Sequence, residues 1–157
     1  MNVKLRARLI PLSAVTRRPI GSGCFTFSGD ADSMVTAREV LMGFLKPYFS
    51  NEVEEFDVFI TLQEALANAV MHGCRNDASK TIHCAVAIDR SAFTITIRDP
   101  GPGFDVEAVT QPAEAAANVT QHRRGICLMR SVMDEVAYQN GGSELQLRKV
   151  RKVLRSL

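Results

Sequence analysis

The chain has 157 residues, of which 46% are hydrophobic and 23% are charged, so it fits one ordinary globular domain and is not globally disordered. It has no run of about 18 apolar residues, and basic residues interrupt its first ten positions, so we expect neither a membrane partner nor a signal peptide. The net charge of +2 is unevenly distributed: residues 1–18 and 148–157 carry five Lys or Arg each, and the segment between them has 9 basic and 17 acidic residues. Because this segment has no basic stripe and the chain has no Trp, we expect no nucleic-acid partner.

The four cysteines, at positions 24, 74, 84 and 127, are far apart in the sequence and form no CxxC pair. They do not cluster with the three histidines either, so the spacing does not favour a zinc site or a redox motif. We therefore expect free thiols, which fits a protein of the reducing cytoplasm.

Hydrophobic periodicity and turn residues predict an uneven alternation of strands and helices. In chain order we expect strands at 3–10 and 24–27, helices at 30–47 and 52–72, strands at 81–89 and 92–98, a helix from about 125, and strands at 136–138 and 144–150. Between them, the segment Gly21 to Gly23 is predicted to be loop, and Asn140-Gly141-Gly142 is predicted to be a hairpin turn. This order favours a two-layer α/β sandwich with a mixed, mostly antiparallel sheet and about three helices on one face.

Two segments have more specific expectations. Apolar and basic residues alternate over 3–10, which is typical of a half-exposed strand that either lies at a sheet edge or pairs in a homodimer. The segment from 99 to about 121 is rich in Gly, Pro, Ala and polar residues, and it is too long for an ordinary connection. We expect it to be either a functional flap or disordered.

The first motif is EALANAVMHG at 64–73, in the second predicted helix. At about 100° per residue, Glu64, Asn68 and His72 lie on one stripe beside the apolar face. A carboxylate can act as a base, and an amide oxygen suits a hard cation such as Mg²⁺. The alternative is the ordinary polar boundary of an amphipathic helix.

The second motif is DPGPGF at 99–104, directly after a strand of buried character. Asp99 can accept a hydrogen bond from an exocyclic amine, while Gly101 and Gly103 let the backbone approach a flat base because they have no Cβ. A plain Pro-Gly turn is the alternative.

The third motif is Arg123-Arg124-Gly125-Ile126, at the start of the third predicted helix. Free backbone amides and the helix dipole favour phosphate there, and arginines add charge-assisted donors. A solvated helix cap is the alternative.

The three motifs occur in the order of the N box and the two glycine boxes of the Bergerat-fold ATPases, the superfamily of gyrase, histidine kinases and mismatch-repair ATPases, which the chain resembles. In detail, EALANAVMHG, DPGPGFD and RGICLMRSVMDEV are similar to the bacterial anti-sigma-factor serine kinases of the partner-switching family. The resemblance covers about residues 24–150, and we expect residues 1–157 to form a single histidine-kinase-like ATPase domain.

The resemblance implies an ATP-dependent serine/threonine protein kinase that uses Mg²⁺. Its substrate would be a serine on an anti-sigma-factor antagonist, and its alternate partner would be a sigma factor. The family assigns the base to Glu64, the Mg²⁺ ligand to Asn68 and the acceptor of the adenine amino group to Asp99. Gly101 and Gly103 would shape the adenine slot and hinge the flap.

The resemblance also implies that Gly125 and Ile126 begin the helix that receives phosphate. Arg124 would contact the γ-phosphate, and His72 would either contact phosphate or cap its helix. Arg123 departs from the family pattern, which usually has a glycine there. Its side chain would either restrict closure of the flap or supply another phosphate contact.

Two alternatives stay open. A non-catalytic binding module would use the same fold to hold a partner, with or without ATP. An ATPase module from a larger two-component signalling protein would need an upstream helical hairpin with a phosphoacceptor histidine, and the 23 residues before the first predicted core strand contain no His.

Overall fold

The computed structural model describes residues 4–5, 20–107 and 121–151. Its strands and longer helices are β1 (Lys4–Leu5), β2 (Gly21–Ser28), α1 (Ala31–Leu45), α2 (Glu52–Asn68), β3 (Thr81–Ile88), β4 (Ala92–Arg98), α4 (Gln121–Val132), β5 (Glu135–Gln139) and β6 (Glu144–Val150). The strands form one sheet in the order β1-β2-β3-β4-β6-β5, and every pairing between the described strands is antiparallel.

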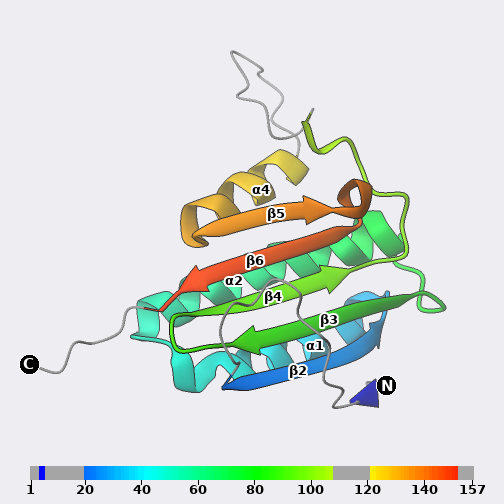
Figure 1. Ribbon diagram of the computed structural model, residues 1–157. Helices are drawn as coiled ribbons and strands as arrows, with labels where there is room; N and C mark the ends of the chain where they lie inside the picture. The colour runs from blue at the N-terminus through cyan, green and yellow to red at the C-terminus, as the bar shows by residue number, and fades with distance from the viewer. Residues whose placement is uncertain (1–3, 6–19, 108–120, 152–157) are drawn as a thin grey trace, which may run out of the picture.

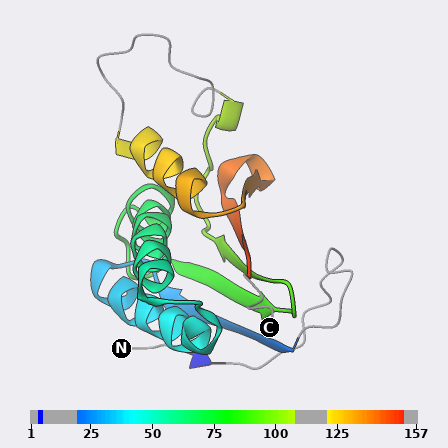
Figure 2. The ribbon, with the colours of Figure 1, turned by 90° about the vertical axis from the view of Figure 1, so that its left-hand side faces the viewer.

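The three described helices cover one face of this sheet. Figure 1 shows α1 and α2 behind the strands, with α4 beside β5, and Figure 2 shows all three on the same side of the sheet. The predicted two-layer α/β sandwich is therefore confirmed. None of the helices in the described ranges is long and apolar enough to cross a membrane.

The core lies between the sheet and the helices. On β3 and β4 the buried positions alternate with more exposed ones, and the register places Cys84 opposite Ile97 and Val86 opposite Ile95. The helices contribute a second set of fully buried side chains: Leu41, Leu45, Leu62, Leu66, Ile126 and Met129. Burial of these apolar surfaces holds α2 and α4 firmly against the strands.

Polar side chains define where the first two helices begin. The Asp30 carboxylate accepts a hydrogen bond from Ser33 N at 2.9 Å and caps α1. The side chain of Asn51 accepts from Glu54 N at 2.9 Å and caps α2, while the Glu54 carboxylate accepts from Ser50 N at 2.6 Å. These reciprocal bonds place the start of α2 close to the predicted residue 52.

Helix α2 does not end as predicted. It continues into a π-helical segment, Ala69–Cys74, and stops where Arg75 adopts a left-handed conformation with φ of 57°. Helix α4 likewise begins at Gln121, four residues before the predicted start at Gly125. π-Helical turns are frequent at functional sites, and this one follows Asn68 directly.

One of the two predicted turns differs from its prediction. Gly21 to Gly23 belong to β2 and are not loop, because they continue the antiparallel pairing with β3 opposite Ile88 and Val86. The predicted hairpin turn between β5 and β6 is confirmed: the two strands pair antiparallel up to Gln139 and Glu144, and the connection between them contains a short 3₁₀ segment, Asn140–Gly142.

The N-terminal strand is described only at Lys4 and Leu5, which pair with Thr26 and Phe25 of the same chain. These two residues therefore form a sheet edge, as one of the two alternatives predicted. The rest of the predicted strand lies outside the described residues, as does most of the predicted flap. The homodimer stays a prediction.

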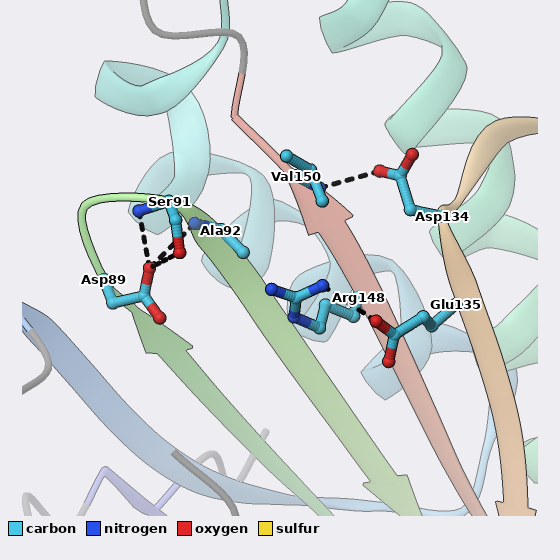
Figure 3. A network of polar contacts seen from close by, with 7 residues as sticks. All are labelled: Asp89, Ser91, Ala92, Asp134, Glu135, Arg148 and Val150. Atoms are coloured by element: carbon cyan, nitrogen blue, oxygen red, sulfur yellow. Dashed lines mark hydrogen bonds and ion pairs between the residues drawn. The ribbon is translucent and has the colours of Figure 1, made fainter. Parts of the chain in front are cut away.

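The end of the sheet at residues 89–92 and 148–150 is held by polar contacts (Figure 3). Asp89 accepts hydrogen bonds from Ser91 N at 2.6 Å and Ala92 N at 2.8 Å. Arg148 donates to Glu135 at 2.8 Å. Because β4 and β6 pair from Ala92–Val150 to Arg98–Glu144, this network closes one end of the sheet, and Asp99 follows β4 at the other end.

Candidate functional site

A pocket of about 400 Å³ lies at the end of the sheet where β4 finishes. Its walls come from α2 and the π-helical segment, from the loop after β4, from α4 and from the connection between β5 and β6. It is lined by Ala65, Asn68, Ala69, His72, Gly73, Ile97, Asp99, Gly103, Phe104, His122, Tyr138, Gly142, Ser143 and Leu145. Asn68, His72, Asp99 and Gly103 are therefore the predicted site residues that line it.

The π-helical segment and the loop after β4 meet at glycines. A Cβ on Gly73 would lie 2.6 Å from the Cβ of Asp99 and closer still to its carboxyl group. A Cβ on Gly101 would lie 2.7 Å from the Cα of Gly73. Only glycine permits this approach, and it brings the end of the first motif against the second.

The second close approach involves the connection between β5 and β6. Gly103 has a φ of 72°, and a Cβ there would overlap the carbonyl group of Gly141. Phe104 N donates to Gly141 O at 2.9 Å, and Asp99 N donates to Ser143 O at 3.0 Å. The loop after β4 is thus held on both sides, which places its carboxylate at a defined position in the pocket.

Asp99 is half-buried in the pocket wall. Burial raises the pKa of its carboxyl group, although hydrogen bonds from backbone amides, including Gly101 N at 2.8 Å to Oδ1, act in the opposite direction. An amine donor that met this carboxylate would favour its charged form. The group is therefore suited to accept a hydrogen bond from a ligand with an exocyclic amino group.

Glu64, Asn68 and Gly125 come together where α4 passes α2. A Cβ on Gly125 would lie 3.0 Å from Glu64 Oε2 and 3.6 Å from Asn68 Nδ2. Asn68 Nδ2 is buried and has no hydrogen-bond partner among the described residues. The Nδ2 group can only donate, but the amide oxygen of Asn68 and the carboxylate of Glu64 are ligands of the kind that Mg²⁺ prefers, so the donor set fits the metal that the resemblance implies.

The remaining residues of the third motif point in different directions. Arg124 is exposed, Arg123 is half-buried, and Ile126 is only 1% exposed within the apolar core. The side chain of Ile126 therefore anchors α4, and because the helix already begins at Gln121, the N–H groups of Gly125 and Ile126 lie beyond its first turn and are not free helix-terminal donors.

Sequence reasoning missed several pocket residues, above all His122, Phe104 and Tyr138. The rings of Phe104 and Tyr138 lie 4.9 Å apart, and those of Phe104 and His122 lie 4.5 Å apart. His122 directly precedes the third motif, which was the only signal for it in the sequence. Tyr138 reaches the pocket because β5 lies next to β6, and β6 next to β4, in the sheet. No local sequence pattern reveals this strand order.

Comparison with known proteins gives a family and several relatives. The histidine kinase-like ATPase domain family matches residues 27–149. The chain is 27% identical over 128 residues to the anti-sigma F factor of Geobacillus stearothermophilus, covering 78% of this chain and 88% of the relative. It is 29% identical over 128 residues to the anti-sigma F factor of Anoxybacillus flavithermus, with the same coverage.

A third relative, the anti-sigma F factor of Halalkalibacterium halodurans, is 28% identical over 113 residues, which is 71% of this chain and 77% of the relative. The family match spans most of the chain and includes all three motifs. An ATPase domain binds ATP, so ATP is the nucleotide expected here. The chain belongs to the histidine kinase-like ATPase domain family.

Proposed function

We propose that the chain is an ATP-dependent serine/threonine protein kinase of the anti-sigma-factor type, acting as a single domain in the cytoplasm. The observation that carries the proposal is the joint position of Glu64 and Asn68 beside Gly125, at the same pocket that Asp99 lines. One region offers a carboxylate base and an oxygen ligand, and another offers an acceptor for adenine. Transfer of phosphate from ATP needs one region that holds the adenine and another that carries out the chemistry at the phosphate.

Asp99 would receive the adenine amino group in this proposal, and the glycines around it would leave the slot flat. Gly101 and Gly103 shape that slot through their close contacts with Gly73 and Gly141. The apolar wall includes Ala65, Ala69 and other small or aliphatic side chains, which suit the face of a purine.

Asp99→Asn is expected to weaken ATP binding by about tenfold or more, because an amide presents a donor where the carboxylate only accepts. Calorimetric titration of both proteins with Mg-ATP measures this difference. Asp57→Asn, at an exposed position of α2, is the matched control and should bind ATP as the wild type does. Unchanged affinity in Asp99→Asn would show that Asp99 is only a turn residue.

Asn68 would be the protein ligand of Mg²⁺, which would neutralise phosphate charge when bound. Arg124 would form the phosphate end of the site through its guanidinium group, beside Gly125 and Ile126, whose lack of a side chain and buried side chain respectively keep α4 close to α2. His72 lines the same pocket and would contact the nucleotide there.

Removal of Mg²⁺ with EDTA is expected to weaken ATP binding by about tenfold or more, because one amide oxygen binds a cation only when phosphate oxygens supply further ligands. Adenosine has no phosphate and should bind equally well with and without EDTA. Titrations of both ligands under both conditions measure the effect. Undiminished ATP binding in EDTA would contradict the role of Asn68.

Glu64 would act as the base that accepts the proton of the incoming serine hydroxyl while the γ-phosphate is transferred. The relatives are named anti-sigma F factors, so the proposed substrate is a serine on an antagonist protein and the alternate partner is a sigma factor. The test is transfer of ³²P from γ-labelled ATP to the serine of such an antagonist from the same cell. A protein that binds the antagonist but never labels it would be a non-catalytic binding module.

A further inference from the structure

His122 of α4 lies in the pocket wall and has no role in the proposed function. Its ring contacts His72, with centroids 5.1 Å apart and planes at 76°. It also contacts Phe104, which in turn contacts Tyr138. We call these four rings the aromatic cluster; all four residues line the pocket.

The aromatic cluster leaves a polar atom unsatisfied. His122 Nε2 is buried and has no hydrogen-bond partner among the described residues. A buried polar atom without a partner is unfavourable, so a ligand acceptor that reached this nitrogen would stabilise the site. The structure therefore contains a ring nitrogen without a partner at the wall of the pocket, and this nitrogen donates whenever it carries a proton.

The charges nearby indicate which ligand would satisfy it. Residues 121–132 of α4 contain three Arg and no acidic residue. The carboxylate next to α4 is that of Glu64, which lies beside Gly125, whereas Asp99 lies in the loop after β4. A positive helix next to an unsatisfied nitrogen favours an anionic acceptor such as phosphate.

Protonation of His122 would respond to such a ligand. Burial and the neighbouring His72 lower the pKa of His122, so its ring is neutral at pH 7 in the free protein. The groups around it are His72 from the π-helical segment, Phe104 with Tyr138 behind it, and Arg123 on its own helix. None of these is an acid; the acids of the site are Asp99, which lines the same pocket, and Glu64 beside Gly125. An arriving phosphate would add negative charge at the ring, raise its pKa and cause it to take up a proton.

We propose that His122 binds the phosphates of the nucleotide in this pocket and acts as a pair with His72. The proposal rests on the proposed function, because the nucleotide supplies the phosphate. It adds His122 as a phosphate-binding residue. His122 directly precedes Arg123, the position at which this chain has an arginine in place of the family's usual glycine.

The test compares wild type with His122→Phe, which keeps a ring against His72 and Phe104 but has no donor. Calorimetric titration with Mg-ATP should show about tenfold weaker binding by the variant, whereas adenosine should bind both proteins equally. Titrations in buffers of different ionisation enthalpy should show proton uptake with Mg-ATP in wild type and less in the variant. Wild-type affinity for Mg-ATP should be higher at pH 6 than at pH 8.

Two further variants complete the design. His122→Gln keeps a donor and should retain part of the lost affinity, and it replaces His122→Phe if that protein unfolds early on heating. His83→Phe, at an exposed position of β3, is the matched control and should change neither affinity nor proton uptake.

Equal affinity and equal proton uptake in wild type and His122→Phe would overturn the inference and leave the proposed function intact. An equal loss of Mg-ATP and adenosine binding would also overturn it, because that result indicates packing of the aromatic cluster and not phosphate contact. If wild type binds neither ligand, the proposed function fails and the inference fails with it.

Discussion

Glu64→Gln is expected to retain Mg-ATP binding and to lose phosphoryl transfer by about 10²- to 10⁴-fold, the range that a positioned base contributes. The substitution keeps the size and helix propensity of the residue, and Glu64 is only half-buried, so the fold should be unaffected. Asn68 and Gly125 beside it are unchanged, and the walls of the pocket remain in place. The measurement is the single-turnover rate of ³²P transfer from ATP to the serine of the antagonist.

The matched control for this experiment is Glu52→Gln, which changes an exposed carboxylate at the start of the same helix. It should transfer phosphate at the wild-type rate. If Glu64→Gln also transfers at the wild-type rate, Glu64 is not the base. If neither protein labels the antagonist although both bind it, the chain is a binding module that retains a nucleotide pocket.

Gly73→Ala is expected to weaken ATP binding by about a hundredfold or more. The added Cβ would occupy the position of the Asp99 carboxyl group. Because Gly101 also packs against the Cα of Gly73, the segment around Gly73 and the loop after β4 cannot move apart without losing this packing. The carboxylate would have to leave the place from which it meets the adenine amino group. Calorimetric titration with Mg-ATP and thermal unfolding measure affinity and fold separately.

Gly43 offers the matched control. It is an exposed residue of α1, and a Cβ there would meet nothing within 4 Å. Gly43→Ala should therefore leave ATP binding unchanged and stabilise the protein by about 0.5–1 kcal/mol, because alanine is the better helix former. ATP binding by Gly73→Ala at wild-type affinity would show that the contact between Gly73 and Asp99 does not shape the nucleotide site.

The sequence predicted the sheet and helices well because the signals for them are local. The alternation of β-branched and polar residues in β3 and β4, and the caps Asp30 and Asn51, depend on residues only a few positions apart. The three motifs predicted most of one wall of the pocket for the same reason. Asn68, His72, Asp99 and Gly103 all line it.

The rest depends on contacts between distant segments. The π-helical widening after Asn68 brings Gly73 against Asp99, a packing that helical periodicity does not register. The contact of the β5–β6 hairpin turn with the loop after β4, where Phe104 N donates to Gly141 O at 2.9 Å, is also invisible to any local pattern. Tyr138 enters the pocket through the same long-range packing.

The most direct test of the account compares the dissociation constants of Mg-ATP and Mg-GTP. Asp99 accepts an amino group in the proposed site, and GTP presents an oxygen acceptor where ATP presents that amino group. Calorimetric titration should therefore show one saturable site with about a hundredfold preference for ATP, and Asp99→Asn should reduce the preference. Equal affinity for ATP and GTP, or no binding of either nucleotide, would contradict the assignment of this pocket.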